Sequence, residues 1–301
     1  MRVLVNMDNR SSKSAISMLY ESICGFLRRC LFRVLAFGSI PQHIAFIMDG
    51  NRRFSRSRNL EGGLGHRVGF LALMSILRHC YELGVKYVTV YAFSIDNFNR
   101  RPDEVQSIMD LMQEKIEELL KEESIVNKYG IKINFFGNLN LLNEPVRRSA
   151  ERAMVVTAGN TRAVLSVFVA YTCTDEIVHA VQESCHKKWA RILEEKPNGP
   201  DNDDDMIECF GKNGLEESEI TVVDLERNMY TAECPDPDIL VRTSGETRLS
   251  NFLLWQTTCC QLLFPSALWP EISLRHLLWT ILEYQRVQPY LEKKKRLRIL
   301  E

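Results

Sequence analysis

The sequence feature that most constrains the fold is an apolar run at residues 44–48 that ends abruptly in the polar sequence Asp-Gly-Asn-Arg-Arg. Short apolar runs of this kind are typical of strands buried in a parallel sheet. A glycine-rich turn at residues 62–65 and a segment with helical periodicity at residues 67–81 follow. This order of strand, polar loop and helix predicts an α/β fold whose polar loop lies at the ligand-binding carboxyl edge of the sheet. Taken alone, the loop is also explained as a surface turn with a structural salt bridge.

The alternation of strand and helix patterns continues along the chain. Further strands are predicted at residues 85–93, 131–136, 163–171, 238–243 and 261–264, and further helices at residues 102–126, 143–158, 174–193 and 274–285. This order predicts one α/β domain over residues 41–301, with a central, mostly parallel, six-stranded sheet flanked by helices. The acidic stretch at about residues 194–220 predicts a disordered insertion rather than a calcium site, since it lacks the glycine and glutamate of a calcium-binding loop.

Residues 1–40 form a separate N-terminal segment. Between residues 14 and 37 apolar side chains recur at helical spacing, with Arg28, Arg29 and Arg33 among them. These charges, together with Glu21, exclude a helix that spans a bilayer. We therefore expect a basic amphipathic helix that lies on a membrane surface or against a partner. A helix that packs only on its own domain is the alternative.

The composition narrows the function. The 301 residues carry a formal net charge of −1, which gives no general attraction for nucleic acid, so any anion binding has to be local. The nine cysteines have no CxxC spacing and the six histidines form no HExxH motif, so we expect no zinc site built by the protein. Cysteines without a pairing pattern are typical of reduced thiols in a protein that faces the cytosol.

Three of the predicted strands end in loops that are rich in arginine and in hydrogen-bonding side chains. In a parallel sheet these loops meet at one edge, and arginine forks match the oxygens of phosphate groups. These loops carry more arginines than one phosphate group can pair with, which indicates that they bind one or two diphosphates. No Walker A or GxGxxG motif occurs, which argues against a nucleotide. The candidate residues are Asp49, Gly50, Asn51, Arg52, Arg53, His66, Ser94, Asn97, Arg100, Arg101, Arg242, Arg248 and Ser250.

Two further features indicate what this site binds. Asp49 is the candidate metal ligand, because Mg²⁺ usually takes only one or two carboxylates and also bridges phosphate oxygens. The helices after the first two strands carry apolar faces with Leu71, Ile108 and Met112, which either wall an apolar cleft or belong to the ordinary core. The sequence therefore predicts a Mg²⁺-assisted diphosphate site, with or without an apolar cleft beside it.

Five motifs in this order resemble the cis-prenyltransferases, the family of undecaprenyl and dehydrodolichyl diphosphate synthases. They are IMDGNRR, GGLGHRVGF, VYAFSIDNFNR, ILVRTSGETRLSNFLLWQ and LWPE, and the resemblance covers residues 41–285 apart from the acidic insertion. The first two motifs are most similar to those of plant dehydrodolichyl diphosphate synthases and rubber-type enzymes. The resemblance implies repeated condensation of an allylic diphosphate, such as farnesyl diphosphate, with isopentenyl diphosphate, to give a long-chain cis-polyprenyl diphosphate.

The resemblance also implies roles for the candidate residues. Asp49 positions Mg²⁺ on the allylic diphosphate and assists its departure, and Asn51 relays the proton that is lost. Asp49, Asn51 and Ser94 are thus the implied catalytic residues. The backbone at Gly50, with Asn51, Arg53 and His66, holds the allylic diphosphate, and Arg52 is a further substrate-binding residue. Isopentenyl diphosphate is held by Arg242, Arg248 and Ser250, while Ser94, Asn97 and Arg100 lie between the two positions.

The sequence departs from the bacterial pattern at three places. Gly62 stands where that pattern has an arginine, Gln261 stands where it has a metal-associated glutamate, and no glycine follows Gly245, so the Arg-x-Gly motif of the homodimeric enzymes is absent. These departures resemble the catalytic subunit of the heteromeric eukaryotic enzyme. We therefore expect a Nogo-B-receptor-like accessory subunit that supplies the motif, little activity without it, and a peripheral position on the cytosolic face of the endoplasmic reticulum membrane.

Two alternatives differ from this interpretation. A non-catalytic partner subunit or lipid-binding scaffold of such a complex has no need to keep the intact set of site residues. That set is Asp49, Asn51, Arg53, His66, Arg242 and Arg248. A short-chain cis-prenyl diphosphate synthase differs only in product length. That length depends on how the apolar tunnel closes, which the sequence does not show.

Overall fold

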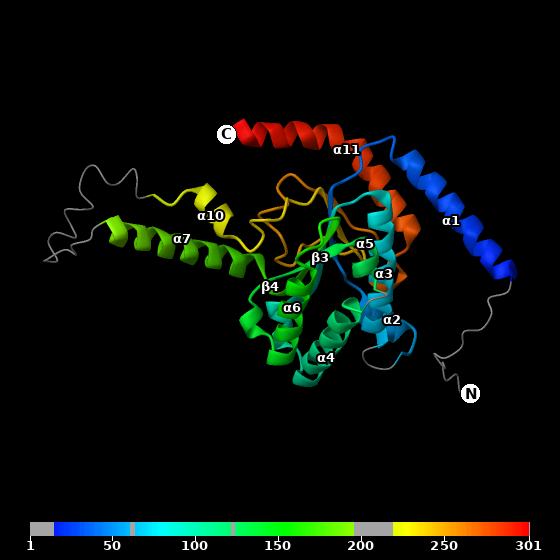
Figure 1. The fold of residues 1–301 in the computed structure, drawn as a ribbon, viewed down its shortest axis with the longest axis horizontal. Coiled ribbons are helices and arrows are strands. Elements are labelled where there is room, and N and C mark those ends of the chain that lie inside the picture. Colours follow the sequence, from blue (N-terminus) through cyan, green and yellow to red (C-terminus); the bar gives the residue numbers. More distant parts are fainter. Residues whose placement is uncertain (1–14, 61–63, 122–123, 196–218, 301) are drawn as a thin grey trace, which may run out of the picture.

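The computed structural model describes residues 15–60, 64–121, 124–195 and 219–300 (Figure 1). In this part of the chain six strands form one sheet in the order β3-β4-β2-β1-β5-β6, and every neighbouring pair is parallel. The predicted fold class is therefore confirmed. The strands are β1 (His43–Ile47), β2 (Tyr87–Ser94), β3 (Ile131–Phe136), β4 (Ala163–Tyr171), β5 (Ile239–Arg242) and β6 (Gln261–Leu263).

Helices connect the strands and cover the sheet. The α-helices are α1 (Ala15–Leu35), α2 (Asn51–Ser57), α3 (Leu64–Leu83), α4 (Pro102–Leu119), α5 (Ile125–Tyr129), α6 (Glu144–Thr157), α7 (Cys173–Glu195), α10 (Val222–Asn228) and α11 (Leu274–Leu300). Three short 3₁₀ helices lie at η1 (Ile95–Asn99), η2 (Leu139–Leu141) and η3 (Trp269–Glu271). In Figure 1, α7 and α10 extend away from the sheet on the side opposite α1.

The central strand β1 is buried on both faces, which explains its unbroken apolar sequence. Ile44 and Phe46 face a core that also contains residues of α3, α4, α6 and α11. Ala45 and Ile47 face a second core, in which Phe252 stacks on Tyr91 with ring centroids 4.3 Å apart. That second core anchors the long segment after β5 against the sheet.

The structure adds α2 and α10, which were not predicted, and changes the bounds of two predicted helices. The polar residues after β1 form α2 rather than a turn, because Gly50 takes φ 113° and lets the helix begin directly after it. The helix expected over residues 102–126 is divided into α4 and α5, since Ser124 caps a new helix and Gly130 ends it at φ 59°. The last helix, α11, continues through Pro289 to Leu300. The predicted disordered insertion lies largely, and Gly62 wholly, outside the described residues.

Helix α1 packs on the domain along one side only. Phe32 and Leu35 are buried, and the Arg28 Nε lies 3.0 Å from the Glu82 carboxylate of α3. On its opposite side α1 exposes large apolar side chains, which are Ile23, Phe26, Leu27, Leu31 and Val34, with Phe37 just beyond its end. The helix therefore packs on its own domain and also presents an apolar surface outward. Among the described residues no helix has both the length and the apolar character to cross a bilayer.

The buried His43 at the start of β1 predicts how stability depends on pH. Its Nδ1 lies 2.6 Å from the Pro235 carbonyl oxygen and its Nε2 2.7 Å from the Thr89 hydroxyl, and burial lowers its pKa to about 4. In the unfolded chain His43 is protonated near pH 6.5, whereas in the native state it is protonated only near pH 4. Stability is therefore lost as pH falls through this window, by about 2 kcal/mol between pH 7 and pH 5.

Urea unfolding at these two pH values measures the effect. His43→Gln removes the titrating group and should reduce the loss between pH 7 and pH 5 by about 2 kcal/mol. His186→Gln is the matched control, because His186 is exposed on α7. An equal pH dependence in wild type and His43→Gln would contradict the prediction.

Candidate active site

One cavity of about 640 Å³ lies at the carboxyl edge of β1, β2 and β5, below the start of α2. The structure brings together here all the residues of the predicted catalytic and substrate-binding set. Of the wider set of candidates, only Arg101 does not line the cavity. The lining residues from the predicted set are Asp49, Gly50, Asn51, Arg52, Arg53, His66, Ser94, Asn97, Arg100, Arg242, Arg248 and Ser250.

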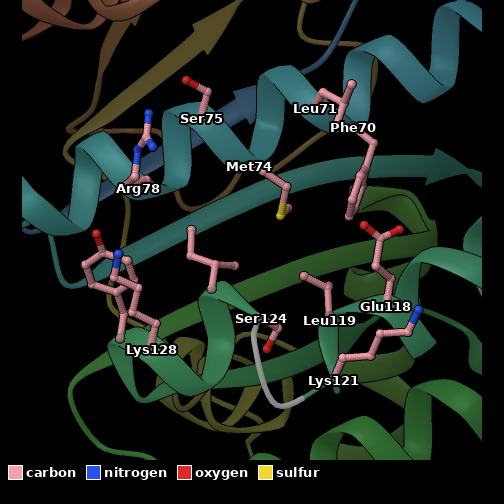
Figure 2. Close-up of a pocket in the computed structure, with 12 residues that line it drawn as sticks. Phe70, Leu71, Met74, Ser75, Arg78, Glu118, Leu119, Lys121, Ser124 and Lys128 are labelled. Carbon is pink, nitrogen blue, oxygen red and sulfur yellow. The ribbon is translucent and has the colours of Figure 1, made fainter. Parts of the chain in front are cut away.

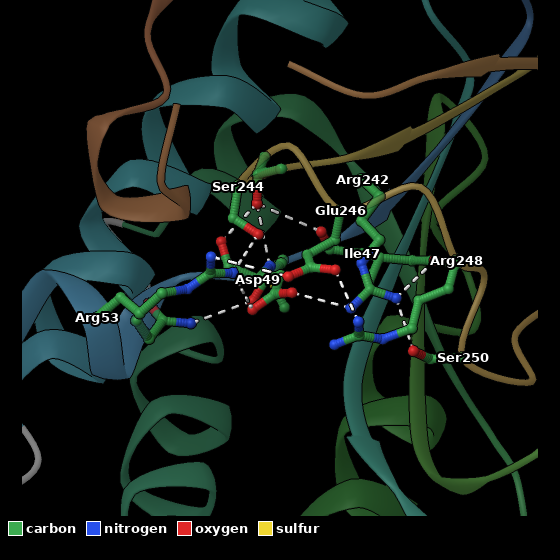
Figure 3. Close-up of polar contacts among 11 residues, drawn as sticks. Ile47, Asp49, Arg53, Arg242, Ser244, Glu246, Arg248 and Ser250 are labelled. Carbon is green, nitrogen blue, oxygen red and sulfur yellow. Dashed lines mark hydrogen bonds and ion pairs between the residues drawn. The ribbon is translucent and has the colours of Figure 1, made fainter. Parts of the chain in front are cut away.

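Asp49 is the carboxylate at the centre of the polar contacts (Figure 3). Its Oδ2 accepts a 2.9 Å hydrogen bond from Arg242 Nη2, and its Oδ1 lies 3.4 Å from Arg53 Nη2. The Thr243 hydroxyl donates to the Asp49 carbonyl oxygen at 2.6 Å and lies 3.0 Å from the Asp49 backbone nitrogen. Burial raises the pKa of Asp49, but the hydrogen bond and charge of Arg242 and the charge of Arg53 outweigh it and lower the pKa below its ordinary value. The carboxylate is therefore ionised at neutral pH.

Arg242 ties Asp49 to the segment that carries the other predicted residues. Its side chain is 5% exposed, and its Nη1 donates 2.6 Å hydrogen bonds to the Arg248 carbonyl oxygen and the Ser250 hydroxyl. In the same segment several residues other than glycine adopt left-handed backbone conformations, which cost free energy and are common at functional sites. They are Ser244, Ser250, Asn251 and Leu253, with φ between 49° and 75°.

Two glycines of α3 leave room for Asn51 to lie close to that helix. A Cβ atom at Gly69 would lie 2.2 Å from Asn51 Oδ1, and one at Gly65 would lie 2.5 Å from the Asn51 carbonyl oxygen. The Asn51 Nδ2 donates to the Met48 carbonyl oxygen at 3.2 Å, whereas its Oδ1 is buried without a partner among the described residues. That Oδ1 is an acceptor available to a ligand, as a proton relay requires.

The loop after β2 holds its polar residues by local hydrogen bonds. Ser94 caps the 3₁₀ helix η1 by accepting from the Asp96 backbone N–H at 3.1 Å, and the Ser94 N–H donates to Asn97 Oδ1 at 3.2 Å. Nearby, burial and the charge of Arg100 lower the pKa of His66, with a smaller contribution from Arg52. His66 is therefore neutral at pH 7 and can donate one hydrogen bond and accept another, but it adds no charge.

The cavity continues from this polar mouth into an apolar interior between α3, α4 and the sheet. Ile108 and Met112 line it and also pack against the main core, so both predicted alternatives, an apolar cleft and the ordinary core, apply to them. Leu71 does not: it is exposed and lines a second cavity of about 600 Å³ between α3, α4 and α5 (Figure 2). The two cavities share Phe70 and Leu119 as walls. The site therefore combines a charged mouth with an apolar interior.

Several residues of the site were missed in the sequence. Thr243, Ser244 and Glu246 follow β5, and all three contact Asp49 or Arg53. The motif around them contained them, but nothing in their spacing showed that they reach the loop after β1. Conversely, Gln261 pairs with Ile239 at the start of β6, so it lies at the amino end of the strands and does not line the cavity.

The fold and the site define a class of protein. A parallel sheet that brings one carboxylate and several guanidinium groups to the mouth of an apolar cavity suits a diphosphate that carries an apolar tail. The family model described as "Putative undecaprenyl diphosphate synthase" matches residues 47–291. The chain therefore belongs to this family, the cis-prenyltransferases, and it is a prenyltransferase.

Individual relatives agree with the family. A dehydrodolichyl diphosphate synthase of Solanum lycopersicum is 59% identical over 283 residues, covering 93% of this chain and 97% of the relative. The rubber cis-polyprenyltransferase of Hevea brasiliensis is 53% identical, covering 90% and 93%. A dehydrodolichyl diphosphate synthase complex subunit of Homo sapiens is 37% identical, covering 92% and 77%. The crystal structure of lavandulyl diphosphate synthase from Lavandula x intermedia, in complex with dimethylallyl diphosphate, superposes with a TM-score of 0.66 at 28% identity, covering 81% and 95%.

Proposed function

We propose that this cis-prenyltransferase condenses farnesyl diphosphate, or an allylic diphosphate of similar size, with successive isopentenyl diphosphates. The product is a long-chain, dehydrodolichyl-type cis-polyprenyl diphosphate. The observation that carries the proposal is the single cavity that joins a cluster of arginines around Asp49 to an apolar interior. Incorporation of radiolabelled isopentenyl diphosphate into a lipid-soluble product, sized by reversed-phase chromatography, tests it.

Two diphosphates fit the charges of the mouth. In our proposal Arg52, Arg53 and His66 hold the allylic diphosphate, and Arg242 and Arg248 hold isopentenyl diphosphate, with the Ser250 hydroxyl beside them. The new carbon–carbon bond forms as the allylic carbon–oxygen bond breaks, and negative charge then grows on the departing diphosphate. Fixed guanidinium groups stabilise this charge more in the transition state than in the ground state, which accelerates the step. In our proposal Asn51 Oδ1, buried and without a partner among the described residues, relays the proton that the isopentenyl unit loses to a phosphate oxygen of the departing diphosphate.

The donor set at the mouth suits Mg²⁺. Among the described residues no group of three or more His, Cys, Asp or Glu side chains forms a closed metal site. A single carboxylate at Asp49 matches the coordination preference of Mg²⁺, which usually takes water and substrate phosphates as its other ligands. When bound there, Mg²⁺ supplies positive charge to the leaving diphosphate. Asp49 is ionised at neutral pH and so would hold the ion without first losing a proton.

The same proposal includes a partner and a membrane. We infer a heteromer with a Nogo-B-receptor-like accessory subunit, supported by the human relative, whose name describes it as a complex subunit. We also infer peripheral contact with the cytosolic face of the endoplasmic reticulum membrane. The outward apolar side of α1, which includes Phe26 and Val34 beside the exposed Arg29 and Arg33, supports this contact. Such a surface is suited to lie at the boundary between lipid headgroups and acyl chains.

A buried carboxylate predicts a specific defect in isopentenyl diphosphate binding. Glu176 accepts four hydrogen bonds, from the Tyr171 hydroxyl at 2.6 Å, Gln256 Nε2 at 2.9 Å, and the Thr231 backbone N–H and hydroxyl at 3.2 and 3.0 Å. Through Gln256 it fixes the end of the segment that begins with Arg248. We expect Glu176→Gln to raise the KM for isopentenyl diphosphate about tenfold and to leave the KM for the allylic substrate unchanged, since one amide NH₂ replaces an acceptor.

Steady-state kinetics on the complete complex, with each substrate varied in turn, separates the two constants. Glu183→Gln, two turns further along α7, is the matched control. Equal changes in both KM values, or a change in kcat alone, would show that Glu176 does not act through the isopentenyl diphosphate position.

A further inference from the structure

Two carboxylates that the proposed mechanism does not use are paired with the arginines that it does use. Glu246 Oε2 accepts a 2.6 Å hydrogen bond from Arg248 Nη1, and Glu246 Oε1 lies 3.9 Å from Arg53 Nη1 (Figure 3). Glu104 Oε1 lies 3.1 Å from Arg100 Nη1 and 3.6 Å from Arg52 Nη1. Each carboxylate thus accepts a hydrogen bond from one guanidinium group of the cavity mouth and lies within ion-pair distance of a second.

Glu246 lies between the two proposed diphosphate positions. Arg53 belongs to the position of the allylic diphosphate and Arg248 to that of isopentenyl diphosphate, and Glu246 contacts both. A carboxylate and a diphosphate compete for the same N–H donors of a guanidinium group, because both accept the same forked hydrogen bonds. A diphosphate that takes Arg248 Nη1 must therefore displace Glu246, and one that binds Arg53 lies near the negative charge of Glu246.

We propose that Glu246 is a competing anion that weakens diphosphate binding at the mouth of the cavity and thereby speeds the release of inorganic diphosphate. The inference rests on the proposed function. Each condensation leaves one inorganic diphosphate behind and requires the lengthened allylic diphosphate to move before the next cycle. A mouth made only of arginines would hold both anions too tightly for repeated cycles. Glu246 returns to the arginines as each diphosphate leaves, so the charge of the mouth stays balanced.

The substitution Glu246→Gln tests this role, because glutamine keeps the size and the polar character of the side chain and removes the charge. Calorimetric titration of the full-length chain with inorganic diphosphate and Mg²⁺ measures the affinity. We expect the dissociation constant to fall about fivefold, which corresponds to about 1 kcal/mol, the upper range for an exposed charge pair. In the complete complex we expect kcat to fall as diphosphate release slows.

Controls distinguish the proposal from the other roles that a glutamate at this place can have. Glu283→Gln breaks an ion pair with Arg286 within α11, away from the cavity, and should leave the affinity unchanged. Glu246→Ala, a second variant that loses the same charge, should tighten binding as Glu246→Gln does, and the circular dichroism of both variants reports their folding. Unchanged or weaker diphosphate binding would overturn the proposal, as would a higher Mg²⁺ requirement, which would make Glu246 a metal ligand. Failure of the wild-type complex to incorporate isopentenyl diphosphate would instead overturn the proposed function, since the binding comparison does not depend on turnover.

Discussion

The variant Asp49→Asn is expected to lose nearly all incorporation of isopentenyl diphosphate, with a fall in kcat on the order of 10³-fold. Asparagine keeps the size of the side chain but cannot bind Mg²⁺ with a full charge. The charge of Asp49 also holds Arg242 Nη2 at 2.9 Å and Arg53 Nη2 at 3.4 Å. The substitution therefore removes the proposed metal ligand and also loosens the two arginines that face the diphosphates.

The assay for Asp49→Asn follows radiolabelled isopentenyl diphosphate in the complete complex, at saturating concentrations of both substrates. Asp110→Asn is the matched control, since Asp110 is exposed on α4, accepts from Gln106 Nε2 at 2.7 Å within that helix and does not line the cavity. Unchanged incorporation by Asp49→Asn would refute the catalytic role of this chain. It would favour the alternative of a non-catalytic subunit or lipid-binding scaffold.

The fold was largely predictable because its strands are apolar runs, buried on both faces in β1 and β5 and on alternate residues in β3. The runs at residues 131–136 and 163–171 have the same bounds as β3 and β4, since Gly130 and the loop before Ala163 delimit β-branched and aromatic runs. Helix α2 was not predicted, because its only buried side chain is Phe54 and a periodic pattern needs more than one. The helix begins where it does because Gly50 has a positive φ. The polar sequence around Gly50 is equally typical of a turn.

The site was predictable to the extent that parallel strands send their following loops to one edge. Asp49, Ser94 and Arg242 each end or follow a strand, and all three line the cavity. The ion pairs and hydrogen bonds among the residues of the site were not predictable. Glu246 contacts Arg53, which lies 193 positions earlier, only because the segment after β5 takes left-handed conformations at residues such as Ser244. Sequence periodicity carries no information on such backbone angles.

The purified chain alone is expected to incorporate isopentenyl diphosphate at least about 100-fold more slowly than its complex with an accessory subunit that carries an Arg-x-Gly motif. The physical reason is the balance of charge between the two proposed positions. The proposed allylic position has Arg52 and Arg53, Arg100 lies between the two positions, and the isopentenyl position has Arg242 and Arg248. Arg242 also donates hydrogen bonds to Asp49 and Ser250, so only some of its N–H groups are free to bind a diphosphate. Losing one buried, hydrogen-bonded charge pair costs about 2–5 kcal/mol of binding free energy, which covers a loss of about 100-fold in the use of isopentenyl diphosphate.

Co-expression with candidate accessory subunits, followed by purification and assay at equal concentrations of this chain, measures the difference. The matched control is the same complex with the arginine of the partner's Arg-x-Gly motif replaced by alanine. If the motif completes the isopentenyl diphosphate position, this control should assemble normally, have a raised KM for isopentenyl diphosphate and approach the rate of the chain alone. Full turnover by the chain alone would contradict the prediction and would mean that Arg242 and Arg248 suffice. A complex whose rate does not depend on that arginine would assign the partner a role in folding or membrane placement instead.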